Sequence, residues 1–273
     1  HGDIDPCKAL MKSCNDVMMH MAADLGATRF AKYVRSFGFG SKTGIDLPGE
    51  AEGGIFSKEK LHQVELATSS FGQGQTVTMI QLASAFSAVI NGGNYYQPHV
   101  VKEINSESGA VVSSNDNTLV KRVVSEDAGK LIRKYLEKTV EDDEGTANPA
   151  RVKGYVIGGK TGTAEKWPRN EGKYLVSFAG FTPTDKPELM IYVVIDEPHV
   201  SDQAHSTYAT EFASEVLKDV LPMLGIYKQT GKSDSAKKIT LPSTKKGNQL
   251  LEVPKGGFSS STYKVAKSKK NNG

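Results

Sequence analysis

Apolar residues recur at helical spacing in several parts of the chain. Between residues 16 and 25, Val17, Met21 and Leu25 are spaced four residues apart and would share one face of a helix. Capping signals mark the ends of such segments, since Asp5–Pro6 is typical of a helix start and Gly26 of a helix end. The pattern predicts helices over residues 7–12, 16–25, 79–90, 126–140 and 207–221.

Shorter apolar runs predict strands. Residues 176–181 and 189–195 are joined by a short turn that contains prolines, so these two strands should pair antiparallel. Residues 100–104 and 110–112 flank a polar turn and predict a hairpin. Strands joined by short turns, with helices before and after them, indicate an α+β protein whose antiparallel sheet is flanked by helices.

Candidate chemistry lies first at the junction of the two N-terminal helices, where Ser13 and Asn15 stand two residues apart. On a continuous helix their side chains would point about 200° apart, whereas in a turn they would share a side. Both residues can serve one pocket only if the helix breaks here. Each also fits a purely structural role, because serine and asparagine are common helix caps.

A second candidate is the Gly-Gly-Lys-Thr-Gly-Thr-Ala run at residues 158–164, which follows apolar residues 155–157 and predicts the start of a strand. Lys160, flanked by glycines, can reach over a pocket and hold an anionic group beside a reacting carbonyl. Strand alternation puts Thr161 and Thr163 on the face opposite Lys160, so a common site predicts a local twist or bulge. Alone, Lys160 fits a solvated strand lysine equally well.

Ser13-x-Asn15 followed by Lys160-Thr161-Gly162 matches two of the three motifs that build penicillin-recognising acyl-transfer sites. Other short motifs follow in the order seen in one family, at residues 37–40, 43–50, 71–74, 76–83, 91–93, 145–147 and 195–198. Over roughly residues 1–227 the chain resembles the transpeptidase domain of class B penicillin-binding proteins. The similarity is to sporulation and division members from Gram-positive bacteria.

This resemblance implies a β-lactamase/transpeptidase-like fold in residues 1–228, as the C-terminal part of the domain. The Lys/Ser-rich composition of residues 229–273 predicts a disordered tail. It implies serine acyl transfer on stem peptides that end in D-Ala-D-Ala, which cross-links peptidoglycan without a cofactor. It also implies β-lactam antibiotics as ligands, a membrane glycan polymerase as partner, and the extracytoplasmic face of the bacterial cell membrane as location.

The resemblance also assigns catalytic roles. Ser13 would relay a proton towards the leaving nitrogen, and Asn15 would orient the lysine of the nucleophile motif and the substrate amide. Lys160 would keep the pocket positive and polarise Ser13.

The substrate-binding residues that the resemblance implies are Thr161, Gly162 and Thr163. The two threonine side chains would bind the substrate's carboxylate. The backbone N–H of Thr163 would supply half of an oxyanion hole.

The family's nucleophile lies in a Ser-x-x-Lys motif before the Ser-x-Asn motif, but residues 1–12 contain no such sequence. Two matches, at residues 57–60 and 261–264, come after Ser13 and are out of order. We therefore expect the chain to begin inside the domain and to be inactive alone. A non-catalytic module that binds peptidoglycan or β-lactams, and a D,D-carboxypeptidase or serine β-lactamase relative, remain as alternatives.

Charge is unevenly spread in this chain of net charge +3, because residues 231–273 hold ten lysines against Asp234 and Glu252. Such a tail suits anionic wall polymers, lipid head groups or plain solubility, and a lysine run alone is no specific sign of nucleic-acid binding. No apolar run is long enough to span a bilayer. His199, Asp202 and His205 lie close in sequence, but the resemblance implies no metal there. Cys7 and Cys14 are interpreted as reduced packing residues.

Overall fold

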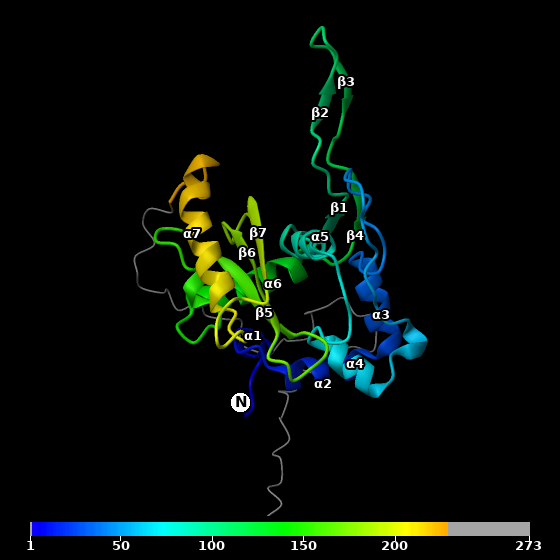
Figure 1. Ribbon diagram of the computed structural model, residues 1–273, viewed down its shortest axis with the longest axis vertical. Helices are drawn as coiled ribbons and strands as arrows, with labels where there is room; N and C mark the ends of the chain where they lie inside the picture. The colour runs from blue at the N-terminus through cyan, green and yellow to red at the C-terminus, as the bar shows by residue number, and fades with distance from the viewer. Residues whose placement is uncertain (1, 229–273) are drawn as a thin grey trace, which may run out of the picture.

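The computed structural model describes residues 2–228. At its centre is a three-stranded antiparallel sheet in the order β5 (Gly158–Glu165), β6 (Tyr174–Thr182) and β7 (Leu189–Asp196), as Figure 1 shows. The predicted antiparallel pairing of the last two strands is therefore confirmed. β5 lies at one edge of this sheet, so its outer side faces no further strand of the sheet.

Helices cover both faces of the sheet, because the central strand β6 carries apolar residues on both of its sides. Phe178 of β6 packs with α7 (Thr207–Met223) in the larger core cluster. Phe181, three positions on and therefore on the opposite face, packs with α5 (Met79–Ile90) and α6 (Glu126–Glu141). This arrangement confirms the predicted α+β class and the three predicted helices.

The N-terminal helices lie at the foot of the sheet, below α6 in Figure 1. Helix α1 (Pro6–Met11) packs against α6, and α2 (Asn15–Leu25) packs against α4 (Gln63–Ser70). The helix α3 (Ala27–Ser36) follows α2 directly at Gly26. Helices α1 and α2 match the predictions closely, whereas α3 and α4 were not predicted.

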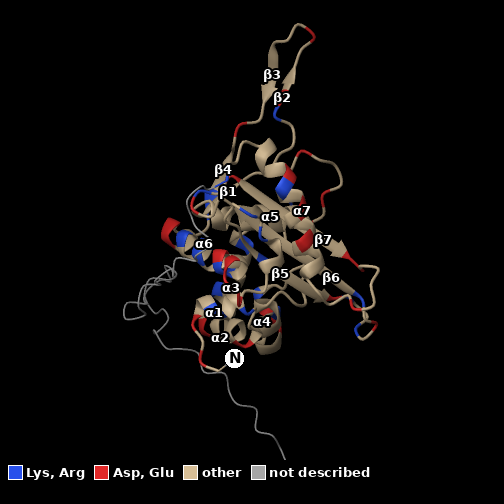
Figure 2. Cartoon of the chain, turned by 90° about the vertical axis from the view of Figure 1, so that its left-hand side faces the viewer, with Lys and Arg blue, Asp and Glu red and all other residues tan. Residues whose placement is uncertain are grey.

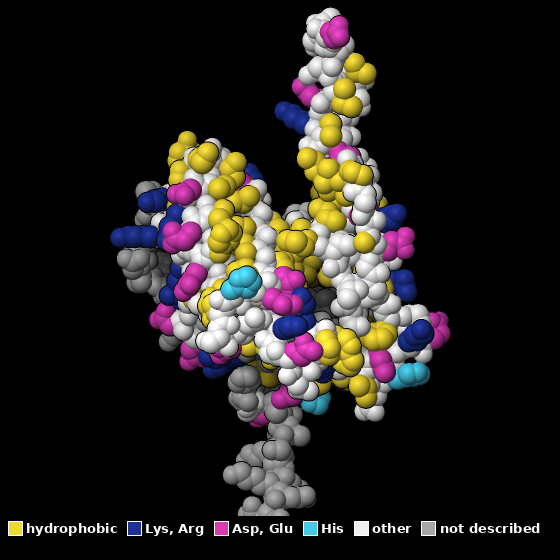
Figure 3. Space-filling model, viewed as in Figure 1, with side chains coloured by type: hydrophobic (Ala, Val, Ile, Leu, Met, Phe, Trp, Pro, Cys, Tyr) yellow, Lys and Arg dark blue, Asp and Glu magenta, His cyan; other side chains and the backbone are white. Residues whose placement is uncertain are grey.

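A hairpin projects from the rest of the molecule (Figure 3). It consists of β2 (Glu103–Asn105) and β3 (Val111–Ser114), which pair antiparallel as predicted and are exposed along their whole length. A second antiparallel pair, β1 (Asn94–Tyr96) with β4 (Leu119–Arg122), connects the hairpin to α5 and α6. Two short 3₁₀ helices, η1 (Lys58–Lys60) and η2 (Asn148–Ala150), complete the described elements.

The apolar residues 155–157 lie just before the strand and are not part of it. Their backbone groups bond to side chains, since Glu141 accepts a hydrogen bond from the N–H of Ile157 and Thr182 donates one to the carbonyl of Val156. The strand begins at Gly158, so the strand start predicted in the run at residues 158–164 is confirmed. Cys7 and Cys14 are free and buried, as expected. The predictions for the lysine-rich tail and for residues 261–264 lie outside the described residues.

Candidate active site

The junction between α1 and α2 is a helix break of a specific kind. The N–H of Ser13 donates to the carbonyl of Leu10 at 3.2 Å, and the N–H of Cys14 donates to that of Ala9 at 2.9 Å. These two bonds form a Schellman C-cap, in which Ser13 occupies the left-handed position, with a φ of 52°. The predicted break is confirmed, and it leaves Ser13 exposed while the neighbouring Cys14 is buried.

Lys160 lies in the edge strand β5, between glycines that let the strand approach the core closely. A Cβ atom at Gly159 would come within 2.5 Å of the Phe178 ring, and one at Gly158 within 2.6 Å of the Phe181 ring. The two aromatic rings thus fill the space that side chains before Lys160 would need. This close packing fixes the strand from which the lysine extends.

The structure brings Lys160 and Ser13 together across 147 positions of sequence. The Lys160 Nζ donates a hydrogen bond of 2.9 Å to the Ser13 Oγ and a second of 2.9 Å to the carbonyl oxygen of Thr161. Ser13 lies at the junction of α1 and α2 and Lys160 lies on the sheet, so their hydrogen bond connects these two parts of the fold. The solvated-lysine interpretation of Lys160 is wrong.

Burial lowers the pKa of Lys160 from 10.5 to about 8. No charged side chain of the described residues offsets this loss of solvation. Figure 2 shows few charged residues on the strands of the sheet; β6 has none, and β7 carries only Asp196, at its end. Lys160 is therefore an isolated cation that holds its proton less firmly than an ordinary lysine.

The other predicted site residues lie close by in sequence but form fewer or longer hydrogen bonds. Asn15 is exposed at the first position of α2, and within residues 2–228 its side chain has no hydrogen-bond partner. The Thr161 Oγ1 lies 3.5 Å from the Lys160 Nζ. Gly162 stands where a Cβ atom would meet the Ser177 Oγ at 2.6 Å, and Thr163 is exposed.

Of the two expected distortions of β5, a local twist or a bulge, the bulge is absent. Pairing with β6 runs without a shift from Gly158 to Glu165, so Thr161 and Thr163 lie on the face opposite Lys160. Lys160 nevertheless reaches Thr161, because β5 is an edge strand and its long side chain can bend round the open side. The edge position of β5 thus brings the Lys160 amine to Thr161 without a bulge in the strand.

Thr139 was not predicted to contribute to the site. It is fully buried on α6, and its Oγ1 donates to the carbonyl of Gly159, the residue before Lys160. A Cβ atom at Gly145 would collide with the carbonyl of Thr139, and that same carbonyl accepts a 2.9 Å bond from the N–H of Ala147. The motif at residues 145–147 therefore packs against the residue that holds β5, which local sequence patterns do not reveal.

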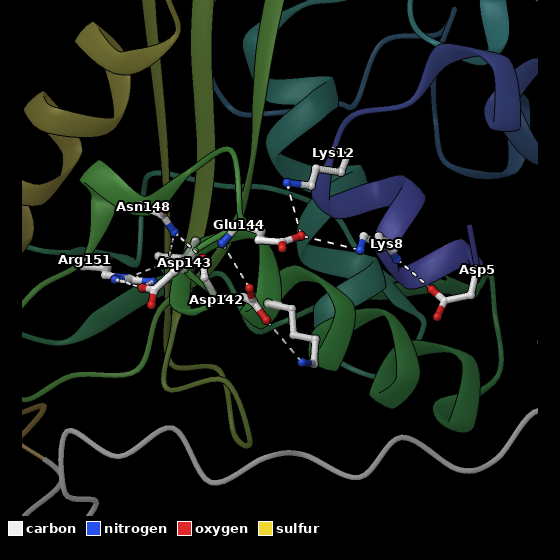
Figure 4. A network of polar contacts seen from close by, with 10 residues as sticks. Asp5, Lys8, Lys12, Asp142, Asp143, Glu144, Asn148 and Arg151 are labelled. Carbon is white, nitrogen blue, oxygen red and sulfur yellow. Dashed lines mark hydrogen bonds and ion pairs between the residues drawn. The ribbon is translucent and has the colours of Figure 1, made fainter. Parts of the chain in front are cut away.

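The same loop also contacts the serine side of the site (Figure 4). The Glu144 carboxylate lies 3.5 Å from the Lys8 Nζ and 3.4 Å from the Lys12 Nζ. Lys12 precedes Ser13, so the loop after α6 contacts the helix before Ser13 and, on its other side, the Thr139 residue that bonds to β5. These ion pairs are half exposed and contribute little stability individually.

Two further contacts lie along β5 and its neighbours. Ser177 lies opposite Gly162 and forms a hydrogen bond with Tyr192. The pKa of Tyr192 is raised, because the effect of burial exceeds the lowering effect of this hydrogen bond. Arg169, in the loop after β5, donates to the Gln73 Oε1 at 3.4 Å. The second contact connects the strand to the 71–74 motif, which was noted only as part of the family pattern.

The polar residues at the end of β7 and in the loop after it are paired, in part with Lys166 from the loop after β5. The Lys166 Nζ lies 2.9 Å from Asp196 and 2.6 Å from Glu197, and His205 lies 2.8 Å from Asp202. Within the described residues, no three His, Cys, Asp or Glu side chains are grouped so that they could hold a metal ion. None of the helices in this part of the chain combines the length and apolar character needed to cross a membrane.

Comparison with known proteins identifies the class to which this fold and site belong. Residues 1–218 match the family described as the penicillin-binding protein transpeptidase domain. The chain belongs to this family, as the resemblance of its motifs indicated.

Individual relatives agree with this assignment. The chain is 41% identical over 260 residues to stage V sporulation protein D of Bacillus subtilis, with 93% of this chain and 39% of that protein covered. It is 32% identical over 216 residues to the peptidoglycan D,D-transpeptidase MrdA of Acinetobacter baumannii, with 71% and 32% covered. The chain thus spans about two fifths or less of these relatives.

Solved structures show the same fold. Penicillin-binding protein 3 of Mycobacterium tuberculosis, complexed with ampicillin, superposes with a TM-score of 0.76 at 26% identity, covering 84% of this chain and 53% of that one. The transpeptidase domain of penicillin-binding protein 3 from Burkholderia pseudomallei gives 0.72 at 26% identity, covering 82% and 65%. The β-lactamase/transpeptidase-like class is therefore confirmed.

Proposed function

We propose that this chain is part of a serine D,D-transpeptidase that cross-links peptidoglycan stem peptides ending in D-Ala-D-Ala. The observation that carries the proposal is the 2.9 Å contact between the Lys160 Nζ and the Ser13 Oγ, which joins two motifs of the family in one site. In this reaction a serine attacks the penultimate carbonyl and D-alanine leaves. The amine of a neighbouring stem peptide then takes the acyl group.

Ser13 relays the proton that the leaving nitrogen needs. A hydroxyl can donate and accept at once, and the bond from Lys160 orients its oxygen. A lysine whose pKa is about 8 exchanges its proton readily near neutral pH, which suits a partner in this relay. Asn15 is the first residue of α2, two positions after Ser13. There its side chain is free to contact the substrate amide and the lysine of the nucleophile motif.

The open side of β5 receives the substrate. An extended peptide can lie along an edge strand and bond to its backbone. Thr161 and Thr163 bind the substrate's carboxylate beside Gly162, and the backbone N–H of Thr163 stabilises the oxyanion of the tetrahedral intermediate. The loss of one such donor commonly costs about 2.7–4 kcal/mol of activation free energy.

The acylated serine itself lies in a Ser-x-x-Lys motif outside these 273 residues. The share of the relatives that the chain spans, 39% and 32%, leaves room for such a segment. We further propose that β-lactams occupy the same site, that a membrane glycan polymerase is a partner, and that the protein works at the extracytoplasmic face of the cell membrane.

Covalent labelling by a fluorescent penicillin tests the proposal. We expect no penicillin adduct on the 273-residue chain, and an adduct on a longer protein that includes the preceding coding region with its Ser-x-x-Lys motif. In the longer protein, Lys160→Met should abolish labelling, whereas Lys153→Met, at an exposed lysine, should not. If the longer protein binds penicillin only reversibly, the chain is a binding module and the proposal is wrong.

A further inference from the structure

Ser13 and Lys160 have the parts of a nucleophile and its base, without help from any other motif. The Nζ and Oγ atoms are 2.9 Å apart, which is within reach for direct proton transfer. Within residues 2–228, Lys160 is the only side chain that bonds to the Ser13 hydroxyl. The serine is exposed, so a small reagent can approach its oxygen from solvent.

The backbone at Ser13 is strained in a way that presents the side chain. Its φ of 52° belongs to the left-handed region, where the C′ position of a Schellman cap usually holds glycine. A non-glycine residue rarely adopts this conformation, and such strain is concentrated at functional sites. The buried Cys14 next to it anchors the turn, together with Ala9 and Val17.

Lys160 is suited to accept a proton because it is largely removed from solvent and has no carboxylate partner within residues 2–228. Burial alone lowers its pKa to about 8, so a substantial fraction of the amine is neutral in mildly basic solution. Several titratable and charged groups on the surrounding elements have other partners: Lys8 and Lys12 with Glu144, Glu137 with Thr184, Glu141 with the N–H of Ile157, and Tyr192 with Ser177.

We propose that Ser13 and Lys160 form a serine–lysine dyad in which Ser13 itself is acylated by small activated esters. The Ser13 Oγ forms a bond to the ester carbonyl carbon, and the bond from that carbon to the aryloxy leaving group breaks. The hydroxyl proton passes to the neutral Lys160 amine and from there to the leaving group. Serine and ester become acyl-serine and phenol, so no further reactant is required.

This activity goes beyond the proposed transpeptidation, in which Ser13 passes a proton but accepts no acyl group. It needs only the two side chains that the chain already holds together. It does not need the substrate-binding strand or a serine from another segment. The two proposals can therefore fail separately.

Acetylation by p-nitrophenyl acetate tests the dyad in the full 273-residue chain. Release of p-nitrophenolate gives the rate, and mass spectrometry of the tryptic peptide that begins at Ser13 locates the acetyl group. Ser13→Gly lacks the hydroxyl but tolerates the positive φ. Lys160→Arg keeps the charge but cannot act as a base, and Lys160→Met removes both the charge and the base. The matched control is Ser57→Ala, at the Ser-x-x-Lys sequence that is out of family order.

We expect acetyl-Ser13 in the wild-type chain, formed at a rate that rises as the pH passes through about 8. Acetylation of this peptide should be absent in Ser13→Gly, roughly 10²-fold slower or more in both Lys160 variants, and unchanged in Ser57→Ala. Circular dichroism establishes that each variant is folded. An unacetylated Ser13 in a folded wild-type chain would overturn the dyad, as would equal rates in wild type and Lys160→Arg. Penicillin labelling of the longer protein would stand in either case.

Discussion

Lys160 donates hydrogen bonds to the Ser13 hydroxyl, to the Thr161 carbonyl and, at 3.5 Å, to the Thr161 hydroxyl, and no carboxylate of residues 2–228 forms an ion pair with it. Taking an ammonium group out of water without an opposite charge destabilises the folded state. The lowered pKa of Lys160 expresses this cost, since folding disfavours the charged form. At this residue the requirements of the site oppose those of stability.

Lys160→Met should therefore stabilise the chain at pH 7 while removing its chemistry. The change in pKa from 10.5 to about 8 corresponds to about 3 kcal/mol in the free energy of unfolding. Below pH 8 the folded chain holds the buried charge and bears the full cost. Between pH 8 and 10.5 the folded lysine loses its proton before the unfolded one, so the wild type gains stability relative to the variant.

Urea unfolding at pH 7 and pH 10 measures this difference, with Lys153→Met at an exposed position as the matched control. The control should leave the free energy of unfolding unchanged at both pH values. A Lys160→Met chain that is less stable than wild type at pH 7 would show that the amine is not buried at a cost.

At the scale of elements, α6 and β5 position the lysine. α6 packs along β5, and the Thr139 hydroxyl bonds to the Gly159 carbonyl within this buried contact. The same hydroxyl lies 2.8 Å from the carbonyl of Leu136, one turn earlier on the helix. The strand that carries Lys160 is thus held from the helix side by one buried hydroxyl.

Thr139→Val should destabilise the chain by about 1–3 kcal/mol, because it keeps the shape of the side chain but leaves the buried Gly159 carbonyl without its donor. Thr139→Ser retains the hydroxyl and should keep the bond, so it serves as the control. Denaturant unfolding of both variants measures the effect. If the valine variant is no less stable than the serine variant, the bond does not hold β5 in place.

The sequence predicted those elements whose ends carry clear signals. Asp5 caps α1 through the N–H of Lys8, and Ser125 caps α6 through that of Ala128, as their positions indicated. α3 was missed because Gly26 is both the C-cap of α2 and the N-cap of α3. The glycine was interpreted only as the end of a helix. α4 was not predicted either, and no side chain caps its N-terminus.

At the scale of the whole molecule, the site is assembled from segments that are far apart in the chain. Local patterns identified the helix break at Ser13 and the strand of Lys160 separately, but only the order of family motifs indicated that they meet. The contacts of Thr139 and Glu144 depend on how α6 and its loop pack between these segments. No periodicity or capping rule reports such packing, so these residues could not be predicted.

The central claim is that Lys160 is buried against Ser13 in one site. NMR titration of the chain with ¹³C-labelled lysine follows every lysine ε-carbon as the pH rises, and the Lys160 signal is assigned by its loss in Lys160→Met. We predict that this one signal titrates near pH 8, apart from ordinary lysines, and that Ser13→Gly changes its midpoint because the hydrogen-bond partner is gone. A Lys160 signal that titrates with the ordinary lysines near 10.5, unaffected by Ser13→Gly, would contradict the account.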